Sequence, residues 1–283
     1  MTELPLVMGI LNVTPDSFSD GGRYLDHAAA IEHGRALIAE GADLVDVGGE
    51  STRPGAEEVD RDTELARVQP VIEALSPHIR VSIDTTKPDV ARAAVAAGAT
   101  LINDVSGSLS PVAAELGVGW VAMHRRGTPA TMQSLAHYDD VVAEVAAELT
   151  RMAEAARRGG VDEVWIDPGI GFAKTAEHNL ALLAHLDHLC ATGFPVLVGT
   201  SRKAFLGAAL ADSDRAGWAR AQRAVLREAA LVDPGVPAEG PVPVDDRIEA
   251  SVATVAWGLA KGARMVRVHD VRPARDAAMV VAG

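Results

Sequence analysis

Short apolar stretches alternate with longer Ala-rich stretches along the whole chain. The apolar stretches are rich in Val, Ile and Leu and end beside polar or charged residues. This pattern predicts buried strands that alternate with helices. The expected strands are Leu6–Val13, Asp43–Gly48, Ile79–Asp84, Thr100–Asp104, Gly119–His124, Glu163–Asp167, Val196–Gly199 and Arg264–His269. The expected helices lie near 26–40, 62–75, 87–97, 111–116, 139–159, 177–191, 203–232, 247–261 and 273–281.

Strands of nearly continuous apolar character, each followed by a helix, predict a parallel sheet that helices cover. A (β/α)8 TIM barrel, one α/β domain over residues 1–283, fits the length and the strand count better than an open doubly wound sheet. A dinucleotide-binding sheet would carry Gly-x-Gly-x-x-Gly after its first strand, and that motif is absent.

Residues 211–246 depart from the pattern. A polar helical piece around Trp218 leads into Val232–Pro243, which contains four prolines and two glycines and therefore predicts a loop. We interpret the whole as an insertion between the seventh and the eighth strand. It is either a solvated excursion on the barrel rim or a part of a dimer contact or of a shield over the site.

Composition narrows the class of protein. The net charge of -13 and the pI near 5.1 argue against a nucleic-acid-binding surface. The lone cysteine, Cys190, excludes an intramolecular disulfide and a cysteine-based zinc cluster. The apolar stretch Leu4–Val13 is too short to span a bilayer and carries Asn12. We therefore expect a cytoplasmic protein without a membrane segment.

The polar residues at the strand ends are the candidate functional residues, because all strands of a parallel barrel end on one rim. A single polar strand end often only caps the next helix, but eight together predict an active rim and argue against a purely structural barrel. These residues are Asn12, Glu50, Asp84, Asn103, Asp104, His124, Asp167, Ser201, Lys203, Arg267 and His269.

The rim residues divide into two chemical groups. One group offers buried acceptors and donors for the edge of a flat heterocycle, and comprises Asp84, Asn103, Asp167 and Lys203. The other suits an anion of the phosphate type, and comprises Asn12, Arg53, Arg267 and His269. The alternatives are a surface arginine for Arg53 and a salt bridge across the rim for Arg267.

Two long loops of small polar residues follow the first two strands. They read Thr14-Pro-Asp-Ser-Phe-Ser-Asp-Gly-Gly and Gly48-Gly-Glu-Ser-Thr-Arg-Pro-Gly-Ala. Loops in this position lie on the active rim, and their composition predicts mobile covers that become ordered on binding.

With these loops the motifs resemble those of the dihydropteroate synthase family of the folate pathway. The resemblance covers almost the whole chain apart from 211–246, and the motifs stand in the family's order. They are Met8-Gly-Ile-Leu-Asn-Val-Thr-Pro-Asp-Ser-Phe-Ser-Asp-Gly-Gly, Asp46-Val-Gly-Gly-Glu-Ser-Thr-Arg-Pro-Gly-Ala, Ser82-Ile-Asp-Thr, Asn103-Asp-Val-Ser-Gly, Met123-His, Asp167-Pro-Gly-Ile-Gly-Phe, Thr200-Ser-Arg-Lys and Arg267-Val-His-Asp.

The resemblance implies that 4-aminobenzoate displaces diphosphate from a dihydropterin diphosphate to give dihydropteroate, by an SN1-like loss of diphosphate. It implies Mg²⁺ as cofactor with Asn12 as a ligand, sulfonamides as inhibitors, and a homodimer. The implied pterin residues are Asp84, Asn103, Met123, Asp167 and Lys203, and the implied diphosphate residues are Asn12, Arg53, Arg267 and His269. The implied 4-aminobenzoate residues are Ser17, Phe18, Thr52, Pro54, Phe172 and Lys203. Asp16, Asp167 and Lys203 are the implied catalytic residues.

One position departs from the family. Ala204 follows Lys203 where some members have a serine that touches aminobenzoate, so that hydroxyl contact is missing. The implied chemistry is nevertheless consistent with the residues, since diphosphate leaves readily once its charge is neutralised and the arylamine attacks with its own lone pair.

Two rival functions share parts of this pattern. A pterin-binding methyltransferase shares the pterin acids but has no need of the Asp-Ser-Phe-Ser and Thr-Arg-Pro-Gly loops or of Arg-Val-His. A non-catalytic paralogue of the synthase would show degraded first and second loops, and both are intact here.

Overall fold

A computed structural model of the protein describes residues 4–14, 27–51, 58–128, 130–225 and 240–283, and of 217–225 it describes the backbone alone. Eight parallel strands form one sheet in the order β6-β5-β4-β3-β2-β1-β8-β7. A parallel bridge between Ile166 and Val196 joins β6 to the start of β7 and closes the ring. The strands are β1 (Leu6–Asn12), β2 (Leu44–Gly48), β3 (Arg80–Asp84), β4 (Leu101–Asp104), β5 (Gly119–Met123), β6 (Val164–Asp167), β7 (Leu197–Val198) and β8 (Met265–Val268).

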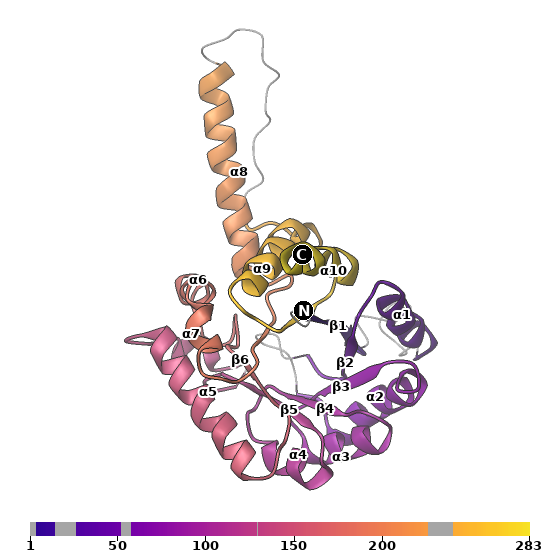
Figure 1. The fold of residues 1–283 in the computed structure, drawn as a ribbon. Helices are drawn as coiled ribbons and strands as arrows, with labels where there is room; N and C mark the ends of the chain where they lie inside the picture. Colours follow the sequence, from indigo (N-terminus) through magenta and orange to yellow (C-terminus); the bar gives the residue numbers. More distant parts are fainter. Residues whose placement is uncertain (1–3, 15–26, 52–57, 129, 226–239) are drawn as a thin grey trace.

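Helices surround this ring (Figure 1), so the predicted (β/α)8 TIM barrel is confirmed. The helices are α1 (His27–Ala39), α2 (Arg61–Leu75), α3 (Pro88–Ala96), α4 (Ser110–Leu116), α5 (Val141–Arg158), α6 (Ala176–Ala184), α7 (Leu186–Cys190), α8 (Ala204–Val225), α9 (Ile248–Ala260) and α10 (Val271–Ala282), with short 3₁₀ turns η1 (Met132–Leu135) and η2 (Val244–Asp246).

Within the described residues the predicted strands and α-helices agree with the observed ones to within a few residues, except in two places, and residues 226–232 of the helix expected over 203–232 lie outside the described part. The helix expected over 177–191 is two helices, because His185 between α6 and α7 leaves the helical region at φ -112° and ψ 29°. The strand expected over 196–199 is reduced to Leu197–Val198.

Local chemistry explains several helix starts on the outside of the barrel. The Asp140 carboxylate accepts from the amides of Val142 and Ala143 and so begins α5. Thr175 and His178 form a reciprocal capping box at the start of α6. Side chains that satisfy the first free amides of a helix stabilise its end by about 1 kcal/mol. These caps fix where the loops between strands and helices end.

Strand alternation separates two cores. Side chains on one face pack against the helices, while the other face points into the barrel. The inner cluster comprises Met8, Leu44, Leu101, Val121, Trp165, Leu197 and Met265, with one residue from each strand except β3. Two residues further along these strands, the same face carries Asp46, Asn103, Met123, Asp167 and Arg267. The barrel interior is therefore apolar toward the strand starts and polar toward the strand ends.

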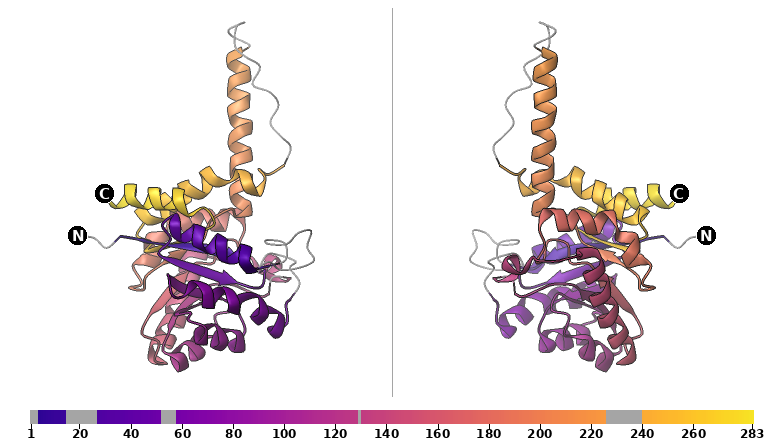
Figure 2. Two further views of the ribbon diagram at one scale, coloured as in Figure 1. Left: turned by 90° about the vertical axis from the view of Figure 1, so that its right-hand side faces the viewer. Right: turned by 90° about the vertical axis from the view of Figure 1, so that its left-hand side faces the viewer.

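The predicted insertion begins inside a helix. Residues 211–225 continue α8 without a break, and α8 projects beyond the other helices of the barrel (Figure 2). Its first turns pack against α9, and the amide of Val242, which precedes η2, donates to the Gly207 carbonyl over 3.0 Å. Residues 226–239 lie outside the described part of the chain. Among the described segments, none of the helices has the length and apolar character needed to cross a membrane.

Candidate active site

A network of buried polar side chains occupies the carboxyl end of the barrel. Arg267 on β8 donates through Nε to Asp46 Oδ2 over 2.6 Å and through Nη2 to Asp84 Oδ2 over 2.8 Å. Asn103 on β4 donates through Nδ2 to the same Asp46 oxygen over 2.8 Å. Asp84 and Asn103 are neighbours in the register of β3 and β4. Four strands thus contribute to one continuous network across the barrel.

Sequence reasoning did not assign a role to Asp46, which is fully buried at the centre of this network. Its second oxygen, Oδ1, is buried without a hydrogen-bond partner among the described residues. The sequence feature that could have identified Asp46 is an acid between two valines in the strand Leu44–Gly48. Asp46 lies on the same face of this strand as Leu44, which points into the barrel. A carboxylate at an inward position of a buried strand is costly unless it is paired, so it indicates a partner from elsewhere in the chain.

The two candidate pterin acids have perturbed pKa values. Burial raises the pKa of Asp84 to about 7, and the positive charge of Arg267 opposes that rise. Burial also raises the pKa of Asp167, against the hydrogen bond from the Gly169 amide and the charge of Lys203. Carboxyls with raised pKa values that lie together in a recess are typical of ligand-binding sites.

Arg267 was predicted for the phosphate-type group, with a salt bridge across the rim as the alternative. The structure contains that salt bridge, and burial would lower the pKa of Arg267 if the negative charges of Asp46 and Asp84 did not raise it. The side chain keeps a fifth of its surface exposed. Its guanidinium therefore contacts Asp46 and one candidate pterin acid, Asp84, directly, and its predicted diphosphate role stays a prediction.

The loop after β6 carries two further predicted residues. Asp167 Oδ1 accepts from the Gly169 amide over 2.7 Å, which turns the chain sharply at the strand end. Phe172 follows on this loop, and the Lys203 ammonium lies 4.3 Å from the centre of its ring. A cation at this distance from an aromatic face is an attractive pair. Lys203 and Phe172, predicted for the 4-aminobenzoate pocket, are thus brought together from different loops.

The remaining described site residues lie at the ends of β1, β5 and β8. His269 Nδ1 is 3.0 Å from Ser201 Oγ, which also accepts from the His269 amide. Asn12 ends β1 opposite Gly48 of β2 and is half-buried. Met123 ends β5 beside Asp167 in the register and is buried. Their predicted roles stay predictions.

Six predicted residues lie outside the described part of the chain: Asp16, Ser17, Phe18, Thr52, Arg53 and Pro54. Beside residues 52–57, the described residue Glu50 is held by hydrogen bonds. Glu50 accepts from the Val59 amide over 3.0 Å and from Lys87 Nζ over 2.5 Å. Lys87 also donates over 2.7 Å to the fully buried Glu64.

Some strand-end residues on the predicted rim serve the fold. The Asp104 carboxylate accepts from Trp120 Nε1 and from the amides of Ser106 and Leu109, so it holds the turn after β4. The ring of His124 is buried behind the rim against Lys174 and not in the network around Asp46. Strand alternation accounts for both, because each is one position away from an inward-facing residue.

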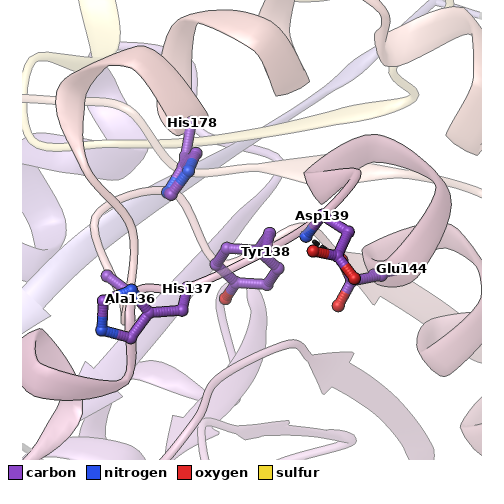
Figure 3. A pocket seen from close by; sticks show the side chains of 6 residues that line it. All are labelled: Ala136, His137, Tyr138, Asp139, Glu144 and His178. Carbon is purple, nitrogen blue, oxygen red and sulfur yellow. Dashed lines mark hydrogen bonds between the residues drawn. The ribbon is translucent and has the colours of Figure 1, made fainter.

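A shallow hollow lies on the outer side of the Phe172 loop, between the segment before α5 and the start of α6. Figure 3 shows Tyr138 at its centre, with His178 on one side and Asp139 and Glu144 on the other. The Tyr138 hydroxyl donates to the Ala173 carbonyl over 3.0 Å. The hollow therefore borders the loop that carries Phe172.

A closed parallel barrel with acids, an amide and two cations converging on its carboxyl end defines a barrel enzyme that binds a polar heterocycle. In agreement with this class, the chain matches the pterin-binding enzyme family over residues 8–269. The chain belongs to this family. Among its relatives, the dihydropteroate synthase of Mycobacterium leprae is 49% identical over 97% of this chain and 92% of the relative.

Solved dihydropteroate synthases share the fold. The Xanthomonas albilineans enzyme with 4-aminobenzoic acid is 44% identical, with a TM-score of 0.80 over 98% of this chain and 92% of that one. The same enzyme in complex with 7,8-dihydropteroate gives 41% identity and a TM-score of 0.77 over 99% and 93%. The Yersinia pestis enzyme in complex with a sulfonamide drug gives 37% identity and a TM-score of 0.83 over 99% and 94%.

Proposed function

We propose that this protein joins 6-hydroxymethyl-7,8-dihydropterin diphosphate to 4-aminobenzoate, releasing dihydropteroate and diphosphate. The observation that carries the proposal is the inward network of Asp46, Asp84, Asn103 and Arg267 beside the Lys203–Phe172 pair. The protein is a transferase of the pterinylmethyl group in folate biosynthesis, in line with the relatives that it matches almost end to end.

The pterin ring occupies the centre of the barrel end. Its amino group and ring nitrogens face Asp84, Asn103 and Asp167, which supply the acceptors and the amide that such an edge needs. Lys203 donates to the pterin carbonyl side, and Met123 packs beside the ring. The support for this arrangement is that the acids are buried and raised in pKa, so a polar ligand relieves their desolvation.

The diphosphate lies toward the ends of β1 and β8, where Asn12, Arg267 and His269 are the described candidates and Arg53 is the candidate outside the described residues. The Arg267 guanidinium forms ion pairs with Asp46 through Nε and with the pterin acid Asp84 through Nη2. A planar guanidinium suits a phosphate oxygen as well as a carboxylate, so Arg267 links the two parts of the substrate.

The candidate residues fit Mg²⁺ held jointly with the substrate. Asn12 offers a side-chain oxygen at the rim, and Mg²⁺ commonly binds through one or two protein oxygens together with substrate phosphates and water. Within the described residues, His, Cys, Asp and Glu form no group of three or more that could hold a metal by themselves. When bound, Mg²⁺ neutralises charge on the leaving diphosphate.

The reaction begins with loss of diphosphate. The bond between the pterin methylene carbon and the diphosphate oxygen breaks, and the electron pair leaves on that oxygen. The electron-rich dihydropterin stabilises the cation on the methylene, and the negative charges of Asp167 and of Asp16, which lies outside the described residues, support it. The amine of 4-aminobenzoate then attacks the methylene and loses one proton.

The 4-aminobenzoate ring lies beside Phe172 and the alkyl part of Lys203. Ser17, Phe18, Thr52 and Pro54 complete this pocket in the proposal, and all four lie outside the described residues. Ala204 supplies no hydroxyl, so the carboxylate of the substrate meets backbone groups at the start of α8 instead. Sulfonamides compete for the same pocket, in keeping with the sulfonamide bound to the Yersinia pestis enzyme. The homodimer that the resemblance implies and the cytoplasmic location expected from the sequence both stay predictions.

A coupled assay for diphosphate release tests the proposal. The purified protein is supplied with the pterin diphosphate, with and without 4-aminobenzoate and with and without Mg²⁺. Release over many turnovers and dihydropteroate formation are expected only when all three are present, and Asn12→Ala should raise the Mg²⁺ concentration needed for half-maximal rate. A protein that binds the pterin but releases no diphosphate under any of these conditions is a non-catalytic paralogue.

A further inference from the structure

Lys174 is a buried cation for which the reaction described above has no use. The residue lies two positions after Phe172, and it is 3% exposed. Its ammonium donates to the Phe172 carbonyl over 3.0 Å and to the Gly169 carbonyl over 3.1 Å. It also lies 3.0 Å from His124 Nδ1 and 3.4 Å from the His124 carbonyl. In the described residues no carboxylate forms an ion pair with Lys174.

Burial of an ammonium group without an ion-pair partner is costly. Burial lowers the pKa of Lys174 to about 7, against the negative charge of Asp167 and together with the positive charges of Arg126 and Lys203, while Glu148 opposes the shift. A site that retains such a group therefore depends on the hydrogen bonds that the group makes. The two shortest bonds to backbone carbonyls, those of Gly169 and Phe172, are on the loop after β6, and the third short contact is to His124 Nδ1, directly after β5.

The His124 imidazole is suited to accept a hydrogen bond from the Lys174 ammonium. Burial, with the charges of Lys174 and Arg126, lowers the pKa of His124 to about 3, so the imidazole is neutral and has one lone pair. The Lys174 ammonium can only donate and lies 3.0 Å from Nδ1, which makes Nδ1 the acceptor and places the imidazole proton on Nε2. Nε2 lies 3.3 Å from Glu148 Oε2 but has no hydrogen-bond partner within the described residues. Lys174 thus connects the end of β5 with the loop after β6.

Two further hydrogen bonds hold the same loop. The Gly171 amide donates to Asn179 Oδ1 over 2.8 Å, and the Tyr138 hydroxyl donates to the Ala173 carbonyl. Gly169 has a φ of +64°, and a Cβ there would lie 1.9 Å from the His124 carbonyl oxygen. Ala173 has a φ of +50°. A loop this close to β5, with a non-glycine residue in the left-handed region, needs surrounding bonds to keep its shape.

We propose that Lys174 is a positioning residue for the condensation, whose ammonium group fixes the backbone of residues 169–173 so that the Phe172 ring stays against Lys203. This inference rests on the proposed role of Phe172 and Lys203 in the 4-aminobenzoate pocket. Lys174 touches neither substrate. It acts through the Phe172 carbonyl, to which it donates.

The test is Lys174→Met, which keeps the length of the side chain and removes its donors. We expect the KM for 4-aminobenzoate to rise about tenfold or more, since a displacement of about 1 Å in a positioning element is enough for such a loss. The KM for the pterin diphosphate should change less, because Asp84 and Asn103 lie on other strands. Hydrogen exchange should accelerate at the amides of Gly171 and Phe172 and stay unchanged in β2 and β3.

Three further variants keep the outcome decisive. Lys261→Met is the matched control, since Lys261, the C-cap of α9, pairs with Asp187 at the surface, and both KM values should stay unchanged. Tyr138→Phe removes one bond to the same loop, and should raise the KM for 4-aminobenzoate about two- to fivefold even if Lys174→Met does not fold. Phe172→Ala tests the pocket itself.

If Phe172→Ala raises the KM for 4-aminobenzoate while Lys174→Met and Tyr138→Phe leave it unchanged, the positioning role is wrong and the pocket stands. If Phe172→Ala also leaves it unchanged, the assignment of the pocket is wrong and the inference fails with it. A lower melting temperature with unchanged KM values would mean that Lys174 serves only stability, which also overturns the proposal.

Discussion

Replacing Arg267 by methionine removes the cation that pairs with both Asp46 and Asp84, at 2.6 and 2.8 Å. Asp46 is fully buried and Asp84 is 9% exposed, so both carboxylates depend on the guanidinium to compensate their charge. Removal of one partner from a buried ion pair typically costs about 3–5 kcal/mol. For a chain of 283 residues the unfolding entropy is about 0.6 kcal/mol/K, and the expected fall in Tm is about 5–8 °C.

The fall in Tm should depend on pH with a definite sign. Burial already raises the pKa of Asp84 to about 7, and Arg267 opposes this rise, so the variant raises the pKa further. A carboxyl whose pKa is raised on folding stabilises the fold while it is protonated, and that stability is lost as the pH rises through the folded pKa. Arg267→Met should therefore lose less stability at about pH 5.5 than at about pH 8.5.

Thermal unfolding followed by circular dichroism at both pH values measures these effects. The control is Arg92→Met, which breaks an exposed pair with Glu115 and should leave the Tm nearly unchanged, because solvent screens exposed pairs. The double variant Arg267→Met with Asp84→Asn should recover part of the lost Tm at high pH. The KM for the pterin diphosphate should rise about 10- to 150-fold in Arg267→Met, from a lost charged hydrogen bond of about 1.5–3 kcal/mol. Equal Tm values for Arg267→Met and Arg92→Met at both pH values, with unchanged KM, would refute the reasoning.

Three further predictions follow from the same geometry. The kcat/KM for the pterin diphosphate should fall as the pH drops below about 7, because protonated Asp84 no longer accepts from the pterin; a pH profile checks this, and Asp84→Asn should lack that limb. Lys87→Met should lower the Tm by about 5 °C, because it leaves the buried Glu64 without its ion-pair partner; a Tm within about 1 °C of the parent would contradict this. Sulfonamides should inhibit competitively with 4-aminobenzoate, and Phe172→Ala should weaken the binding of inhibitor and substrate alike by about 5- to 10-fold. Steady-state inhibition kinetics check this, and noncompetitive inhibition against 4-aminobenzoate would mean that the two molecules bind at different sites.

The barrel itself was predictable because its signal is local. Eight apolar stretches with helices between them leave few folds that bury every strand on both faces, and the observed strands fall at the predicted places. The break at His185 was not predictable in this way, because the apolar pattern of 177–191 continues through it.

The candidate-site residues at the strand ends were predictable, and the one in the middle of a strand was not. Asp84, Asn103, Asp167 and Arg267 were found because a parallel barrel brings its strand ends to one rim. Asp46 was passed over since it lies in the middle of a strand, although its alternation with Leu44 points it inward. Within the described residues Asp104 and His124 proved to support the fold, which their outward register explains.

The sequence by itself determined the kind of elements, their order, and the residue types gathered at the strand ends, since hydrophobic periodicity and strand polarity are properties of the chain. Only the tertiary structure decided which charges meet. Arg267 lies 221 residues from Asp46 and 183 from Asp84 along the chain, and Lys174 lies 50 from His124. Burial then sets the strength of these contacts and the pKa values of the groups, because both depend on the water that the folded barrel excludes.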